Sequence, residues 1–229
     1  MIDWHSHILP QLDDGSQSVF ETLSILSELK NQEVDTVVAT PHFIANNESL
    51  TNFIERRQKS FDSLAEQISD DMPSILLGAE VKYYPGISRL EGLEQLKIQG
   101  TNLLLLEMPV ARWTEYTLRE LTELANSKKI TVMLAHIERY MSNQSKENWD
   151  RLLDNRILMQ VNASYFLGFS KRKAIGQLVG GMIHFIGSDC HNLSSRPPKI
   201  KSAIDYITKK LGANFVSQIN EFGYNQLEK

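Results

Sequence analysis

Seven short apolar stretches recur along the chain, and longer segments with helical spacing separate many of them. Runs of this length and composition are typical of strands buried on both faces of a parallel sheet. The predicted strands span residues 1–5, 35–40, 74–80, 102–107, 130–136, 157–162 and 182–188. This alternation constrains the fold more than any other feature, because strands that alternate with helices form parallel α/β structures.

The helical patterns support the same interpretation. Ser18 and Glu21 have the spacing of a capping box, and the helix that they begin has an apolar face with Leu23 and Leu26. Further helices are predicted over residues 52–68, 114–127, 199–211 and 213–222. Seven repeats that end in two helices favour a closed barrel over an open sheet. We therefore expect an α/β fold, a distorted seven-stranded (β/α)7 TIM-like barrel, as a single domain over residues 1–229.

The composition narrows the class of protein. The net charge is −4 and the basic residues are scattered, which argues against nucleic acid as a partner. No apolar run approaches the roughly 20 residues that span a bilayer, so membrane insertion is not expected. Cys190 is the one cysteine, which rules out a disulfide framework and a thiolate zinc site. With no signal peptide at its start, the chain is predicted to be cytoplasmic.

Residues that bind metals gather where the predicted strands end. Five of the six histidines lie at or just past a strand end, and three carboxylates do the same. Only the sixth strand lacks such a residue. The carboxyl ends of strands in a parallel barrel form one rim, where barrel enzymes carry out their chemistry. These candidates are His5, His7, His42, Glu80, Glu107, His136, Asp189 and His191.

The local spacing points the same way. His5 and His7 form an H-x-H pair, whose imidazoles share a strand face with Asp3, a residue that could orient a ligand. Asp13 and Asp14 follow in a loop, where either carboxylate could reach over the rim. A single histidine at a strand end is most often structural, but the complete set favours a metal site. The sixth histidine, His184, lies inside the seventh strand and is interpreted as structural.

The predicted ligands are imidazoles and carboxylates, which suit Mn²⁺, Fe or Zn²⁺. They exceed what one ion can use, so we expect two or three. Such clusters serve phosphate ester hydrolysis, in which a metal-activated hydroxide attacks phosphorus. Arg139 and Arg196 follow strand-end histidines closely and are the candidates for binding phosphate during catalysis. Arg112 is a weaker candidate for contact with a substrate peptide.

The motifs together resemble one family. They are His5-Ser6-His7, Asp13-Asp14-Gly15, Gly78-Ala79-Glu80, Ala135-His136-Ile137-Glu138-Arg139, and Ser188-Asp189-Cys190-His191-Asn192 with Arg196-Pro197-Pro198. In order, this set resembles the manganese-dependent protein tyrosine phosphatases of bacterial capsule and exopolysaccharide operons, of the polymerase-and-histidinol-phosphatase (PHP) superfamily. The resemblance extends from residue 1 to about residue 200.

This resemblance implies a PHP-type barrel with three metal ions, with Mn²⁺ as the first choice among the metals. By position, the first would take His5, His7, Glu80 and Asp189. The second would share Glu80 and add Glu107 and His136. The third would take Asp14, His42 and His191. The resemblance also implies a phosphotyrosine protein as substrate, such as an autophosphorylated tyrosine kinase that controls polysaccharide export.

Several alternatives remain open from the sequence. The same rim would serve a small-molecule phosphatase, such as a histidinol phosphatase. A metal-dependent amide hydrolase or a non-catalytic metal-binding regulator fits less well. Cys190 and Arg196 also have the C-x5-R spacing of cysteine-dependent phosphatases, but the intervening residues contain no glycine for the tight phosphate loop. We interpret that match as a coincidence.

Overall fold

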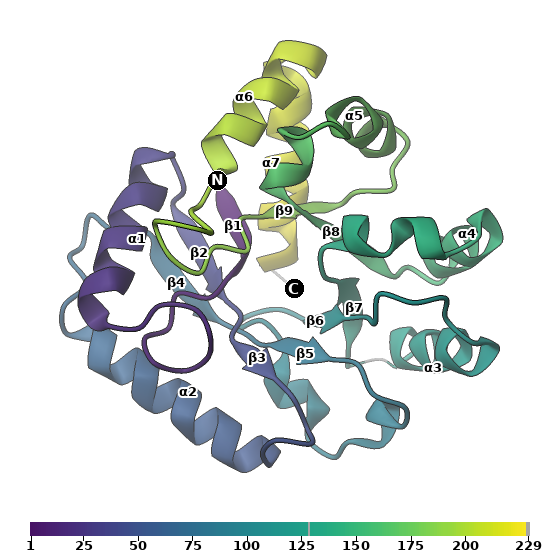
Figure 1. Cartoon of the computed structure of the whole chain (residues 1–229), viewed down its shortest axis with the longest axis horizontal. Helices are drawn as coiled ribbons and strands as arrows, with labels where there is room; N and C mark the ends of the chain where they lie inside the picture. Colours follow the sequence, from purple (N-terminus) through teal and green to yellow (C-terminus); the bar gives the residue numbers. More distant parts are fainter. Residues whose placement is uncertain (128, 228–229) are drawn as a thin grey trace.

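The computed structural model describes residues 1–127 and 129–227, so the predicted domain 1–229 ends two residues past the described chain. Within these ranges parallel strands alternate with helices, and Figure 1 shows the strands gathered centrally with most helices outside them. The strands are β1 (Ile2–Ser6), β2 (Thr36–Ala39), β3 (His42–Phe43), β4 (Ser74–Leu77), β5 (Glu80–Lys82), β6 (Leu103–Glu107), β7 (Thr131–Leu134), β8 (Leu158–Asn162) and β9 (Phe185–Gly187).

The helices include all those that the sequence predicts and two more. They are α1 (Val19–Asn31), α2 (Leu50–Ala65), α3 (Glu115–Ala125), α4 (Lys146–Asp154), α5 (Lys171–Val179), α6 (Ile200–Leu211) and α7 (Ala213–Leu227). Ser18 caps α1 as predicted, but Glu21 accepts the backbone N–H of Gln17 instead of that of Ser18. The described chain contains no helix both long and apolar enough to cross a bilayer.

The strands form two parallel sheets that run into one another. One has the order β1-β2-β4 and the other the order β3-β5-β6-β7-β8-β9. The prediction of one unbroken strand over residues 74–80 was wrong, because the chain breaks at Gly78 and Ala79 between β4 and β5. A second break at Thr40 and Pro41 separates β2 from β3, a short strand that the sequence did not predict.

Backbone hydrogen bonds bridge both breaks and also join the first strand to the last. The N–H of Gly78 donates to the oxygen of Ala39 at 2.8 Å, and Glu80 donates to Pro41 at 3.0 Å. At the far edge, Asp189 donates to His5 at 2.7 Å, and the N–H of His7 donates to the Cys190 oxygen at 2.9 Å. The result is a curled parallel sheet whose first and last strands meet.

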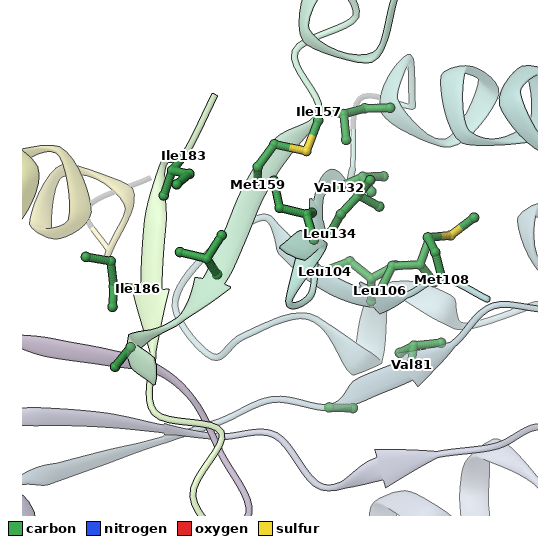
Figure 2. Close-up of a cluster of buried hydrophobic side chains, with 14 of the residues drawn as sticks. Val81, Leu104, Leu106, Met108, Val132, Leu134, Ile157, Met159, Ile183 and Ile186 are labelled. Carbon is green, nitrogen blue, oxygen red and sulfur yellow. The ribbon is translucent and has the colours of Figure 1, made fainter. Parts of the chain in front are cut away.

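Alternation along the strands divides the apolar side chains into two layers. On β6, Leu104 and Leu106 join the larger cluster between sheet and helices, where Figure 2 shows them beside residues of neighbouring strands. Leu103 and Leu105 point the other way and pack in a smaller cluster with Trp4 of β1. Side chains that alternate with period two explain this division. Both faces are apolar, as expected for a buried parallel strand.

Gly187 allows β9 to lie close against β1. A Cβ at this position would lie 2.5 Å from the Cβ of His5 and 2.8 Å from its backbone nitrogen. We expect Gly187→Ala to lower the free energy of unfolding by about 1–3 kcal/mol, the usual cost of overpacking. Urea denaturation measures this change. Gly176→Ala in α5 is the control, because a Cβ there meets nothing within 4 Å and should stabilise the helix. Equal stability of Gly187→Ala and the wild type would contradict this close packing.

Candidate metal centre

The structure brings the predicted ligands together at the carboxyl ends of the strands. His5 lies in β1, whereas His42 and Glu80 follow the carboxyl ends of β2 and β4 and begin the short strands β3 and β5. Glu107 ends β6. The others lie just beyond β1, β7 and β9, in the loops that follow these strands: His7, Asp14, His136, Asp189 and His191. Parallel strands deliver these residues to one rim, as the sequence predicted.

Glu80 lies at the centre of the cluster, and its side chain is buried. Its two carboxylate oxygens contact four imidazoles from three different parts of the chain. The distances are 3.4 Å to His5 Nε2, 3.3 Å to His7 Nε2, 3.0 Å to His42 Nδ1 and 2.7 Å to His136 Nε2. One buried carboxylate among four imidazoles is the arrangement expected of a bridging ligand.

The remaining carboxylates extend the cluster on both sides. Asp14 Oδ1 lies 3.4 Å from both His42 Nε2 and His191 Nε2. Asp189 Oδ1 lies 3.5 Å from His7 Nε2, and Glu107 Oε1 lies 3.6 Å from His136 Nε2. Three groups have donor atoms within 4.8 Å of one another: His7-Asp14-His42-His191, His5-His7-Glu80 and His42-Glu80-Glu107.

Asp13 and Asp14 occupy different positions in this arrangement. Asp13 Oδ2 accepts hydrogen bonds from His7 Nδ1 at 2.7 Å and from the backbone N–H of His42 at 2.9 Å. It therefore orients His7, with Nε2 directed at Glu80, in the manner of a carboxylate that supports a metal-binding imidazole. Asp14 is the one within reach of the other donors. Gly15 is required beside them, since a Cβ there would lie 2.1 Å from the His7 oxygen.

The charges and hydrogen bonds within the cluster favour the binding of a positively charged ion. Burial lowers the pKa of His7, but the hydrogen bonds that its ring donates to Asp13 and Glu80 raise it to about 10. Burial opposes ionisation of Glu80, yet the nearby His5 and His136 hold its pKa well below the usual range. The buried Nε2 of His191 has no hydrogen-bond partner within the described residues. Imidazole and carboxylate donors with an unused buried nitrogen fit divalent metal ions.

The two arginines predicted to bind phosphate contact the cluster at Asp189. Arg139 Nη2 donates to Asp189 Oδ2, and Arg196 Nη2 donates to Asp189 Oδ1 at 2.8 Å. Each side chain is 38% exposed, so both guanidinium groups also face solvent. They line a polar cleft of about 200 Å³ that contains Asp189. Arg112, the weaker candidate, is exposed on the loop after β6.

Strand β8, for which no ligand was predicted, supplies two amides that the sequence interpretation missed. Gln160 and Asn162 are buried and contact His5 and Asp189, respectively. Their spacing of two residues within an apolar strand was the available signal. Asp3 contacts the backbone N–H groups of His5 and Ser188, so it supports the strands instead of orienting an imidazole.

The backbone is unusual at two of the predicted ligands. His136 and Asp189 have positive φ angles of 32° and 52°. Residues other than glycine rarely adopt this region, and such strain concentrates at functional sites. Both residues follow the last residue of a strand closely, so the left-handed turn redirects their side chains at the rim.

Cys190 and His184 take no part in the cluster. Cys190 is buried in the apolar core, where burial and the nearby Asp3 raise the pKa of its thiol. A neutral buried thiol is a poor nucleophile, in agreement with the interpretation of C-x5-R as coincidence. His184 Nδ1 accepts the backbone N–H of Met159 at 3.1 Å, and burial lowers its pKa to about 4. His184 is therefore a neutral structural residue, as predicted.

The fold and this site define a class: parallel α/β proteins that gather imidazoles and carboxylates at the carboxyl ends of their strands. The chain belongs to the CpsB/CapC family of capsular polysaccharide synthesis, whose family model matches residues 1–225. The resemblance inferred from the motifs is thereby confirmed.

The relatives of this chain are tyrosine phosphatases by name. The chain is 34% identical to tyrosine-protein phosphatase CpsB of Streptococcus pneumoniae, covering 96% of this chain and 94% of CpsB. It is 29% identical to tyrosine-protein phosphatase YwqE of Bacillus subtilis, covering 96% and 89%. A crystal structure from a study of YwqE and CpsB, described as metal-dependent tyrosine phosphatases, superimposes with a TM-score of 0.85. Its sequence is 22% identical to this chain, and the match covers 99% of this chain and 94% of the chain in that structure. Because the identity is low, the match supports the fold alone.

Proposed function

We propose that this chain is a metal-dependent protein tyrosine phosphatase. One observation carries the proposal: a buried Glu80 among four imidazoles lies beside Asp189, which two partly exposed arginines contact. The arrangement joins a site for cations to a site for an anion, which phosphate monoester hydrolysis requires. The names of the CpsB and YwqE relatives support the same activity.

The cluster would hold two or three ions; the family resemblance favours Mn²⁺, and the imidazole and carboxylate donors also suit Fe or Zn²⁺. The ligand sets are those inferred from the resemblance. The first is His5, His7, Glu80 and Asp189; the second is Glu80, Glu107 and His136; the third is Asp14, His42 and His191. When bound, such ions activate water and stabilise charge on phosphoryl oxygens.

The residues around the ions have separate tasks in this proposal. Arg139 and Arg196 bind the phosphoryl oxygens, since a guanidinium has five N–H donors and can serve Asp189 and a phosphate together. Asp13 keeps His7 directed at Glu80 through the proton on Nδ1. The tyrosine oxygen, with a pKa near 10, leaves more readily than an alkoxide and needs less help from an acid.

We also infer that the curled sheet closes as a distorted seven-stranded barrel of the PHP type, in one domain over residues 1–229. Counting β2 with β3 and β4 with β5 gives seven strands. The hydrogen bonds from Asp189 to His5 and from His7 to Cys190 support closure between the last strand and the first.

We propose that the substrate is a phosphotyrosine protein of the capsule or exopolysaccharide system, such as its autophosphorylated tyrosine kinase, and that the reaction takes place in the cytoplasm. The family's link to capsular polysaccharide synthesis supports the first part. The free thiol of Cys190 agrees with a reducing compartment.

The substrate class is tested by comparing a phosphotyrosine peptide with histidinol phosphate, each with the Mn²⁺-loaded protein. We expect phosphate release from the peptide with a far higher kcat/KM. Release from histidinol phosphate alone would agree with the proposed metal centre, but it would show that the substrate is a small molecule and not a protein. Release from neither substrate would favour a metal-binding regulator.

Cys190→Ser separates the metal mechanism from a cysteine mechanism. We expect the variant to keep most of the wild-type kcat, because the thiol is buried in the core and away from the cleft. The measurement is steady-state hydrolysis of the phosphotyrosine peptide. Loss of turnover in Cys190→Ser, with turnover of the wild type insensitive to a chelator, would contradict the proposed mechanism.

A further inference from the structure

Strand β8 supplies no predicted metal ligand, but its side chains contact predicted ligands on the neighbouring segments. Gln160 Oε1 accepts the backbone N–H of His136 at 2.6 Å and lies 3.3 Å from His5 Nδ1. Gln160 Nε2 donates to Asn162 Oδ1 at 3.2 Å, and Asn162 Nδ2 donates to Asp189 Oδ2 at 2.8 Å. Both amides are buried, with exposed fractions of 0% and 7%. A single chain of contacts thus connects residues after β7, in β1 and after β9.

The backbone N–H of His136 determines the direction of every hydrogen bond in this series of contacts. A backbone N–H can only donate, so the Gln160 atom that meets His136 must be the amide oxygen. That same oxygen faces His5 Nδ1, which must therefore carry the imidazole proton of the neutral ring. Nδ1–H leaves the lone pair of His5 on Nε2. That nitrogen lies 3.4 Å from Glu80 Oε2, inside the cluster.

The directions of the hydrogen bonds at Asn162 and Asp189 follow in the same way. With its oxygen turned to His136, Gln160 presents its NH₂ group to Asn162 and fixes the Asn162 oxygen there. Asn162 must then turn its own NH₂ group to Asp189. This hydrogen bond occupies Oδ2, which also accepts from Arg139, whereas Oδ1 is the atom near His5 and His7. Asn162 thus helps to determine which carboxylate oxygen faces the cluster.

We propose that Gln160 and Asn162 are positioning residues of the metal centre. Gln160 selects the His5 tautomer that presents Nε2 to a metal ion, and Asn162 orients Asp189 with Oδ1 inward. The proposal rests on the metal-dependent function above. The close packing of the Gln160 amide against Gly187 supports this proposal, because a Cβ on Gly187 would lie 2.9 Å from Gln160 Nε2. Only the absence of a side chain at that position leaves room for the amide.

The test measures Mn²⁺ binding to the folded protein, by the electron paramagnetic resonance signal of free Mn²⁺ during titration. Gln160→Met removes both bonds at nearly constant volume, and we expect an affinity about 10- to 100-fold lower, the usual cost of losing such support. Gln160→Glu keeps an oxygen for His136 and His5 and is expected to recover most of that loss. Asn162→Leu leaves His5 supported and is expected to lower the affinity less than Gln160→Met.

Gln144→Met is the matched control, because this amide also joins two backbone groups, those of Trp113 and Ala111, but on a loop outside the cluster. Its Mn²⁺ affinity should equal that of the wild type. The thermal midpoint of each variant in EDTA reports folding separately from binding. A lower midpoint of Gln160→Met with unchanged Mn²⁺ affinity would overturn the proposal, because the amide would then be merely structural.

Two further outcomes are also decisive. If Gln160→Met does not fold, the affinity of Asn162→Leu decides, and a value equal to that of the wild type overturns the proposal. If the wild type itself binds no Mn²⁺, Fe²⁺ or Zn²⁺, the proposed metal-dependent function fails instead. The failure of the positioning role is thereby distinguished from the failure of the function on which it rests.

Discussion

Replacing Glu80 by Gln is expected to lower kcat for a phosphotyrosine peptide by at least about 10³-fold. The substitution keeps the shape of the side chain but removes the negative charge that four imidazoles surround. Stabilisation by metal ions contributes several kcal/mol to such reactions, and each 1.36 kcal/mol corresponds to about tenfold in rate. Steady-state kinetics together with the metal content of the purified variant measure the effect.

Glu120→Gln is the matched control for that loss. Glu120 is also a buried glutamate, and its carboxylate accepts bonds from Tyr83, Gly86 and Ser88, outside the cluster. We expect this variant to lose about 1–3 kcal/mol of stability through its weakened hydrogen bonds and to retain its kcat when folded. Near-normal turnover of Glu80→Gln would refute the assignment of the cluster as the reaction centre.

The second large effect is expected at the arginines. Arg139→Ala should lower kcat/KM for the phosphotyrosine peptide by about 10²-fold and weaken inhibition by inorganic phosphate, because it removes a donor fork from the cleft. Arg139→Lys should recover only part of the loss, since an ammonium lacks the planar pair of donors. Kinetics with phosphate as a competitive inhibitor measure both quantities.

Arg151→Ala provides the control for the arginine substitutions. Arg151 is partly exposed and pairs with Glu115 at 2.6 Å, on helices away from the cleft. A surface pair of this kind contributes little to stability, so the kinetic constants should stay within about twofold of the wild type. If Arg139→Ala behaved like Arg151→Ala, phosphate binding would have to be assigned to other residues.

The ligand positions could be predicted from the sequence because two local patterns agree. Period-two alternation puts His5 and His7 on one face, and parallel strands deliver their ends to one rim. Glu80, Glu107 and His136 each follow an apolar run long enough to recognise as a strand. For these residues, local patterns were enough to predict that they converge.

Other features depend on contacts between distant segments and could not be predicted. The break between β4 and β5 at Gly78 is bridged by a bond to Ala39, far away in sequence. Asp13 and Asp14 are adjacent and chemically alike, so their spacing left either one open as a ligand, although the resemblance implied Asp14. The bonds of Asp13 to His7 and His42 now distinguish the two. Gln160 and Asn162 acquire their meaning from neighbours on β1 and β9. Their spacing of two residues places both on one face of the strand, but no local pattern identifies these partners.

The metal-dependent mechanism is tested most directly by hydrolysis of a phosphotyrosine peptide by the wild-type protein after removal of metals with EDTA and dialysis. Activity should disappear in the metal-free protein and return on titration with Mn²⁺, reaching a plateau at two or three ions per chain. Undiminished activity of protein shown by elemental analysis to be free of metal would contradict a metal-dependent mechanism.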